Sequence, residues 1–443
     1  MPFFTAPKIQ LARPLRILHT ADWHLGHRLY EQDRSEEHAA ALQWLLDLVE
    51  REKVDVVIIA GDVFDIANPS NQAKELYYEF MAGLNRSRAR AAVVVGGNHD
   101  SPGLLDASRT ILRASNLHVI GAARSQVQEQ VVKLSWEDNG QPQELVVAAV
   151  PYLRERDVRG SNRGELVDDR MAGIRAGIQT HFEEVAAAAT AARSNENVPI
   201  IATGHLFVGS ARDEEGKKSH IYQADENNID AGRFPACFDY VALGHVHRAQ
   251  RIDGLDHVQY CGSLVPLTFV EGQRDRSVSL VDINGAGQGL TYRRIPVPRN
   301  RPLLRLRGTL EEVLAGITDH VTEWCAGDNC DELTPWAEVR VTSDEPLPTL
   351  NTLLQEGITQ ALPENYPAEA LKILFRNRVR LTPAPAASQL PQRDLEEIDV
   401  EEVFQLICDR ADYPAETARA VLEDFRELRN WTQEGGAQNE PAA

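Results

Sequence analysis

The sequence predicts an α/β protein with more than one domain. Between residues 15 and 285, short runs of β-branched and other apolar residues alternate with longer segments of helical periodicity. This alternation is typical of helices packed on sheets. The 443 residues exceed what one hydrophobic core holds, so two or three domains are expected. Several of the expected strands are also followed directly by carboxylate, amide or imidazole side chains.

The expected elements follow one another in order along this first part of the chain. Strands are expected at 16–20, 54–60, 93–95, 198–203, 240–243 and 277–281, with short β-rich runs in 116–150. Helices are expected at about 31–51, 71–85 and 102–114, and Asp100 or Ser101 would cap the last of them. This succession indicates a sandwich of helices and sheets.

The composition is that of an ordinary globular protein with an acidic surface. Hydrophobic residues make up 43% and charged residues 25%, and no apolar run approaches the roughly 20 residues that span a bilayer. No signal peptide is apparent, and the 5 scattered cysteines form no CxxC pair, which indicates a reducing cytoplasm. The net charge of −20 repels nucleic acid, so a DNA substrate would require basic patches, bound metal or a partner subunit.

The polar residues that follow the strands form a candidate metal site. They are Asp22, His24, Asp62, Asn98, His99, His205, His245 and His247. Open α/β sheets bind ligands at the carboxyl ends of their strands, where these residues are expected. Carboxylate, imidazole and amide groups suit a first-row divalent ion, and this number of ligands suits two ions. Each residue alone could be an ordinary loop histidine or helix cap, but the whole set favours metal binding.

These residues also form sequence blocks that match a known family in kind and order. The blocks are Asp22-x-His24, Gly61-Asp62-x-x-Asp65, Gly97-Asn98-His99-Asp100, Gly204-His205 and Gly244-His245-x-His247. Together they resemble the calcineurin-like metallophosphoesterases over residues 15–285. The resemblance implies a four-layer αββα sandwich that binds two divalent metal ions, with Mn²⁺ as the expected metal.

The resemblance also implies a role for each residue. Asp22, His24 and His247 would bind one ion, Asn98, His205 and His245 would bind the other, and Asp62 would bridge the two. His99 would protonate the leaving oxygen or stabilise the phosphoryl group, and Asp100 would orient the His99 ring.

Longer stretches around three blocks resemble the nuclease members of this family. Residues 22–26, 61–65 and 239–247 are similar to double-strand-break repair nucleases of bacteria, archaea and eukaryotes. This similarity implies exonuclease action on double-stranded DNA ends, opening of DNA hairpins, an SMC-type ATPase as partner, a homodimer and no membrane contact. It makes the arginines in 86–90 and 154–156 candidate phosphate contacts, although solvated surface is an equal alternative.

One apolar row is a candidate for the dimer face. Leu76, Phe80 and Leu84 recur on one side of the expected helix at 71–85. The same row could instead be buried in the core of the monomer, and the sequence does not distinguish the two.

The chain changes character after Arg301, which predicts a second, smaller domain. Strands are expected at 303–307, 336–341 and 371–379, with helices at 309–324 and 349–362. We therefore divide the chain into a metallophosphoesterase nuclease domain (1–295), a small α+β DNA-capping domain (296–382), a Pro/Ala linker (383–393), a C-terminal helical pair (394–432) and a disordered tail (433–443). The helical pair would bind the ATPase, or would fold back on the capping domain.

Two other functions are compatible with this sequence. A small-molecule or nucleotide phosphoesterase could use the same metal site, but it would not require the extra C-terminal residues. A scaffold protein with an inactive site is the second alternative, and the full set of metal-ligand residues argues against it.

Overall fold

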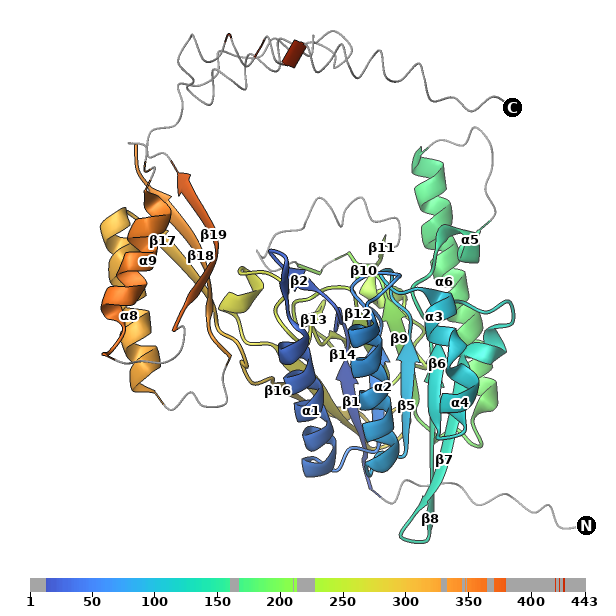
Figure 1. The fold of residues 1–443 in the computed structure, drawn as a ribbon. Coiled ribbons are helices and arrows are strands. Elements are labelled where there is room, and N and C mark those ends of the chain that lie inside the picture. The colour runs from blue at the N-terminus through green and yellow to red at the C-terminus, as the bar shows by residue number, and fades with distance from the viewer. Residues whose placement is uncertain are drawn as a thin grey trace, which may run out of the picture.

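Two six-stranded sheets form the centre of the molecule, and a smaller unit lies beside them (Figure 1). The computed structural model describes residues 13–159, 167–209, 211–212, 228–327, 333–344, 347, 349–364 and 370–379, together with 419, 422 and 425–426.

The first sheet contains the strands that begin the chain. Its order is β16 (Leu290–Pro296), β15 (Ser277–Ile283), β1 (Leu15–Thr20), β4 (Val56–Ala60), β5 (Ala91–Val95) and β6 (Leu117–Ile120). Strands β1, β4, β5 and β6 are parallel, whereas β15 pairs antiparallel with both β1 and β16. The loops that follow β1, β4 and β5 therefore leave the same edge of the sheet.

The second sheet repeats this arrangement. Its order is β13 (Gln250–Ile252), β14 (Leu255–Tyr260), β12 (Tyr240–Gly244), β9 (Ile200–His205), β8 (Gln141–Ala148) and β7 (Val131–Asp138). Strands β14, β12, β9 and β8 are parallel, and β13 and β7 are antiparallel to their neighbours. Two short ladders join β2 (Arg28–Leu29) to β3 (Gln32–Asp33) and β10 (Phe207–Val208) to β11 (Asn228–Ile229).

Helices cover the outer faces of both sheets. The helices outside the first sheet are α1 (Ser35–Arg51), α2 (Asn71–Arg86), α3 (Pro102–Ala107) and α4 (Arg109–Arg113), and those outside the second are α5 (Glu155–Val158) and α6 (Val167–Ala192). Short 3-10 turns lie at η1 (Val127–Gln130), η2 (Ala231–Arg233) and η3 (Glu271–Gln273).

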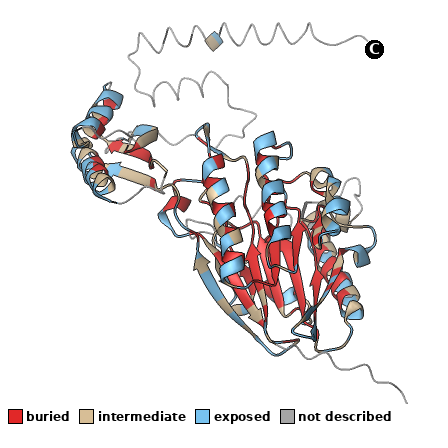
Figure 2. Cartoon of the chain, turned by 60° about the horizontal axis from the view of Figure 1, so that its bottom comes forward, coloured by how far each residue is buried: buried red, intermediate tan, exposed pale blue. Residues whose placement is uncertain are grey.

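The layers follow from the two-residue period of the strands. In β4, Val57 and Ile59 pack against the helices α1 and α2, whereas Val56 and Ile58 pack against the second sheet. A further cluster joins the other face of the second sheet to α6. The order helix, sheet, sheet, helix confirms the predicted αββα sandwich. Figure 2 shows the buried sheets beneath more exposed helices.

The segment expected as one helix from residue 31 begins instead with a hairpin. Tyr30 and Glu31 have φ values of 47° and 62°, which a right-handed helix does not allow, and they form the turn between β2 and β3. Helix α1 then starts at Ser35, whose backbone N–H donates to Oδ1 of Asp33 over 2.9 Å.

Two further expectations about helices are corrected by the structure. The helix expected at 102–114 is interrupted at Ser108, which ends α3 and precedes α4. The apolar row on α2 belongs to the core of the monomer, because Phe80 and Leu84 are buried and Leu76 packs against the same cluster. That row therefore offers no dimer face.

The smaller unit is a three-stranded parallel sheet covered by two helices. Strands β17 (Leu303–Gly308), β18 (Trp336–Thr342) and β19 (Lys372–Val379) alternate with α8 (Leu310–Ala326) and α9 (Leu350–Ala361) around one apolar cluster. Thr309 begins α8 through a capping box, since its side chain accepts from the N–H of Glu312. We call residues 303–379 the capping unit.

The capping unit contacts the first domain near the β2–β3 hairpin. The rings of Tyr30 and Phe375 stack with centroids 5.3 Å apart, and Lys372 Nζ donates to Gln32 over 2.8 Å. Arg301, at the entry to the unit, donates to Glu37 of α1 over 2.9 Å. The capping unit thus sits against the segments that follow β1.

The remaining C-terminal predictions fall on a part of the chain that the structure leaves out. The linker (383–393), the tail (433–443) and, apart from residues 419, 422 and 425–426, the helical pair (394–432) lie outside the described residues. Among the helices of the described part, none combines the length and apolar content needed to cross a membrane.

Candidate metal centre

The loops after five central strands bring the predicted residues together at one end of the sandwich. Asp22 and His24 follow β1, Asp62 follows β4, Asn98 and His99 follow β5, His205 ends β9, and His245 and His247 follow β12. Among the described residues, three groups have ligand atoms within 4.8 Å of one another. Two of them are predicted ligand groups, Asp22 with His24 and His247, and Asp62 with His205 and His245. The third joins His24 to Asp65 and His99. The two predicted ligand groups are thus neighbours in space.

Asp62 lies between the two groups. Its Oδ2 atom is 3.2 Å from Nε2 of His205 and 3.6 Å from Nε2 of His24. Its Oδ1 atom accepts from the backbone N–H of His99 over 2.9 Å, which fixes the carboxylate. A carboxylate between two imidazole groups is the arrangement that a bridging ligand requires.

Asn98 completes the second group with a neutral oxygen. Its Oδ1 atom is 3.0 Å from Nε2 of His205 and 3.0 Å from Nδ1 of His245. The side chain is exposed, unlike the two histidines that it contacts. The amide oxygen and the two ring nitrogens therefore point at one position.

Hydrogen bonds on the far side of three rings leave one nitrogen of each for an ion. His205 Nδ1 donates to the carbonyl of Ala60 over 2.8 Å. His24 Nδ1 lies 3.2 Å from the carboxylate of Asp65, and His247 Nδ1 lies 3.2 Å from that of Glu271. Each ring thus carries a proton on Nδ1 and offers Nε2, as ring partners do around bound metals.

The residues fit a bound cation because buried polar atoms at the site lack hydrogen-bond partners. Oδ1 of Asp22 accepts from the N–H of His245 over 2.8 Å, but Oδ2 is buried with no hydrogen-bond partner. Nε2 of His24 is also buried with no such partner. A buried carboxylate oxygen and imidazole nitrogen are costly unless something binds them, and a divalent ion would bind both.

The backbone at the site adopts conformations that most residues avoid. Asp22, His24, Asp62 and His245 have φ values of 51°, 47°, 48° and 96°. Gly97 has to be glycine, because a Cβ there would lie 2.1 Å from Oδ1 of Asp62. The glycines and turns of the motifs thus bring the ligand side chains close together.

The charges of the site shift the pKa values of its members strongly. Burial lowers the pKa of His205, but the charge of Asp62 and its hydrogen bond outweigh burial and raise that pKa to about 9. Burial also acts on His247, yet Glu271 raises its pKa to about 9. Burial raises the pKa of Glu271, but His247 lowers it to about 2. Metal binding would therefore displace protons from these imidazoles.

The predicted contact between His99 and Asp100 is wrong. The carboxylate of Asp100 is buried and accepts from the backbone N–H groups of Gly97, Phe64 and Val63, over 2.8, 2.9 and 3.1 Å. Nδ1 of His99 donates instead to the carbonyl of Asp65 over 2.7 Å. Asp100 therefore holds the loop after β4 against the loop after β5, and the backbone carbonyl of Asp65 orients the His99 ring.

Comparisons with known proteins extend this picture. A family model described as calcineurin-like phosphoesterase matches residues 15–249, and one described as type 5 capsule protein repressor C-terminal domain matches residues 299–411. The chain is 36% identical to the SbcD subunit of nuclease SbcCD from Escherichia coli K12 over 391 residues, which are 88% of this chain and 92% of that protein. The chain belongs to the calcineurin-like phosphoesterase family.

Other relatives bear the same name. The SbcD subunits of nuclease SbcCD from Rhodobacter capsulatus and Bacillus subtilis are 33% and 29% identical over 79% and 69% of this chain, and over 85% and 76% of their own lengths. Within the phosphoesterase family, the chain is therefore an SbcD-like nuclease, a metal-dependent phosphodiesterase with a dinuclear site.

Two carboxylates of the site were not assigned a function from the sequence. Asp65 belongs to a recognised block, three residues after Asp62, and this position could have indicated that its carboxylate lies beside His24. Glu271 lies in η3, beyond the last block, and no strand pattern precedes it. Asp65 contacts Nδ1 of His24, and Glu271 contacts Nδ1 of His247, so each carboxylate orients a histidine of the predicted ligand set.

Proposed function

We propose that the chain cleaves DNA phosphodiesters with two bound Mn²⁺ ions. The observation that supports this most is the meeting of two ligand groups at Asp62, in a chain that matches SbcD proteins along most of its length. In this proposal Asp22, His24 and His247 hold one ion, Asn98, His205 and His245 hold the other, and Asp62 joins them. When bound, the ions would activate water and neutralise the phosphoryl group.

His99 is proposed to deliver a proton to the leaving oxygen. Its side chain is exposed, and its ring lies 4.8 Å from the ring of His24, centroid to centroid. Because the carbonyl of Asp65 can only accept, Nδ1 of His99 carries a proton, and Nε2 is the atom that would exchange a proton with the substrate.

Arg154 is the candidate phosphate contact that lies near this site. Its guanidinium carbon is 5.7 Å from the ring centroid of Tyr152, and that ring is 6.3 Å from the ring of His205. In contrast, Arg88 and Arg90 precede β5, whose opposite end leads to Asn98. We therefore assign substrate contact to the 154–156 group and not to 86–90, with Arg88→Ala as the matched control for Arg154→Ala.

The proposed partner is an SbcC-like, SMC-type ATPase. The relatives carry the name of a two-part nuclease, SbcCD, of which each is the SbcD part. Residues 394–432 would bind the ATPase through the apolar stripe predicted from their sequence, and the capping unit would contact DNA. Ending the chain at Pro383 should leave metal binding and basal cleavage intact but remove ATPase association. Wild-type affinity of the truncated chain for the ATPase would place the partner surface elsewhere.

A homodimer is also proposed, through the helical layer outside the first sheet. Tyr78 of α2 and Ile111 of α4 are 39% and 78% exposed, so this layer presents apolar side chains that a second copy of the chain could cover. Ile111→Asp should convert a dimeric chain into a monomer in sedimentation experiments. A monomeric wild-type chain at micromolar concentration would exclude the dimer.

A direct assay separates this function from a nucleotide phosphoesterase with the same metals. The full chain, with and without the ATPase, is incubated with blunt duplex DNA, a DNA hairpin and a nucleoside monophosphate in the presence of Mn²⁺. We expect cleavage of the duplex end and the hairpin. Hydrolysis of the nucleotide alone would favour the small-molecule enzyme, and hydrolysis of none, with metal bound, would favour a scaffold.

A further inference from the structure

A buried carboxylate outside the predicted ligand set contacts the first ion group. Glu271 lies in η3, it is 5% exposed, and its Oε1 atom is 3.2 Å from Nδ1 of His247. His247 belongs to the group formed with Asp22 and His24. Glu271 therefore acts on the side of the imidazole that faces away from the proposed ion.

The second oxygen of Glu271 is held by its own loop. Oε2 accepts from the backbone N–H of Leu267 over 2.8 Å and from Oγ of Ser263 over 3.4 Å. With both oxygens engaged, the carboxylate has one orientation, and that orientation fixes the plane of the His247 ring.

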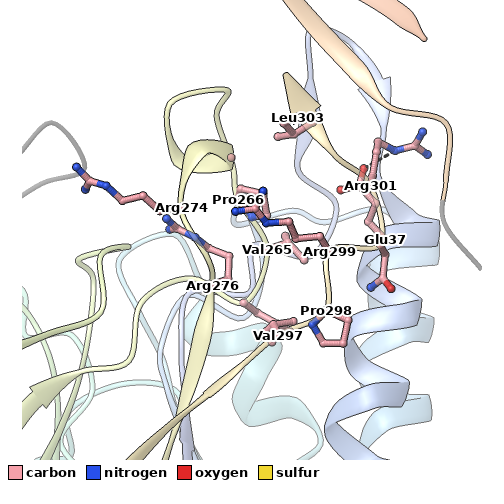
Figure 3. A pocket seen from close by; sticks show the side chains of 13 residues that line it. Glu37, Val265, Pro266, Arg274, Arg276, Val297, Pro298, Arg299, Arg301 and Leu303 are labelled. Atoms are coloured by element: carbon pink, nitrogen blue, oxygen red, sulfur yellow. Dashed lines mark hydrogen bonds and ion pairs between the residues drawn. The ribbon is translucent and has the colours of Figure 1, made fainter. Parts of the chain in front are cut away.

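Arg276 forms hydrogen bonds with the backbones of both His247 and Glu271. Its guanidinium donates to the carbonyl of His247 over 3.0 Å and to the carbonyl of Glu271 over 3.1 Å. It also lies 3.8 Å from Oε2 of Glu271. Figure 3 shows Arg276 in the pocket between this loop and the segment that leads to Arg301 and Leu303.

The loop that carries Glu271 is anchored on its other side by the capping unit. Gln273 Nε2 donates to the carbonyl of Leu303 over 3.0 Å, and Phe269 packs in one cluster with Leu303 and Trp336. Gly272 lies so close that a Cβ there would meet Cβ of Leu303 at 2.6 Å. The loop that carries the Glu271 carboxylate is thus held in place between the first domain and the capping unit.

We propose that Glu271 is a positioning residue for the ion held by Asp22, His24 and His247. It keeps the proton of His247 on Nδ1 and the lone pair of Nε2 directed at the ion, and it makes the ring a stronger donor. The inference rests on the proposed role of His247 as a ligand.

The test is the binding of Mn²⁺ to the metal-free full chain, with bound and free ions counted by calorimetry and electron paramagnetic resonance. Glu271→Gln preserves the size of the side chain and removes its charge. We expect it to weaken one of the two ions by about 10–100-fold and to leave the other unchanged. For DNA cleavage we also expect a lower kcat and an unchanged KM.

Two further variants make the outcome decisive. Glu144→Gln is the matched control. Glu144 of β8 is also buried, at 3% exposed, but its partners are Lys133 of β7 and Ser194 after α6, and none of these residues belongs to the metal site. His247→Ala should lose the same ion that Glu271→Gln weakens. If His247→Ala loses an ion while Glu271→Gln binds both with wild-type affinity, the inference is wrong. If His247→Ala keeps both ions, the ligand assignment itself fails.

Discussion

Oδ2 of Asp62 lies 3.2 Å from Nε2 of His205, and the two side chains come from different sheets of the sandwich. The contact is fully buried on both sides. Removing this carboxylate takes a ligand from both proposed ions at once. We therefore expect Asp62→Ala to abolish cleavage and to reduce bound metal at both positions, as measured by metal analysis after dialysis.

The control for this change is Asp282→Ala. Asp282 pairs with Arg16 over 2.7 Å on the paired strands β15 and β1, and it is not among the ligand groups. It should retain both ions and full activity. An Asp62→Ala protein with wild-type metal content and rate would overturn the bridging assignment.

His99→Ala should lose most cleavage and keep the metal. A positioned acid contributes about 10²–10⁴-fold to a rate, so kcat should fall within that range. Bound Mn²⁺ should stay at the wild-type level because Nδ1 of His99 donates to the backbone carbonyl of Asp65, and His99 is a member of neither of the two ligand groups joined by Asp62. His257→Ala, on β14, serves as the control. Loss of an ion together with activity would make His99 a ligand.

Asp100→Asn should destabilise the fold. The carboxylate accepts from the N–H groups of Gly97, Phe64 and Val63, and an amide would turn a donor toward one of them. We expect a loss of about 1–3 kcal/mol in the free energy of unfolding of the metal-free protein in urea. Asp47→Asn, on the exposed face of α1, should change it by less than about 0.5 kcal/mol. Equal stability of the two variants would contradict the bracing role.

Acid should destabilise the metal-free protein partly through buried histidines. Burial lowers the pKa of His19 and of His38 to about 3. Below about pH 6.5 the unfolded chain binds protons that these native residues do not, so stability falls as the pH drops toward 3. The His38→Leu protein lacks one of these titrating groups. Near pH 5 its free energy of unfolding should therefore fall less steeply as the pH drops than that of the wild-type protein, by about 1.4 kcal/mol per pH unit. Parallel curves for the two proteins would show that His38 titrates in the native state.

The sequence predicted the sandwich and the grouping of the metal-binding residues because both arise from local patterns. Buried strands such as β4 are continuous apolar runs, and polar residues at their ends, such as Asp62, necessarily meet at one edge. The capping unit was predicted for the same reason, since its strands and helices alternate within a short segment.

Features that depend on tertiary contacts were not predictable in this way. The turn at Tyr30 and Glu31 depends on positive φ values that neither residue type favours. The periodicity of Phe80 and Leu84 is the same for a core helix as for a dimer face. Glu271 reaches its histidine from a 3-10 turn 24 residues away in sequence, where no pattern marks it.

The central claim is that this chain hydrolyses DNA with two metal ions joined by Asp62. The most direct measurement adds Mn²⁺ back to the metal-free chain and follows, in the same samples, the number of ions bound and the cleavage of duplex DNA. We predict that 2 ions bind per chain, one for each of the two predicted ligand groups that meet at Asp62, and that cleavage appears only as the second ion binds. Full cleavage with one ion or with none would contradict the account.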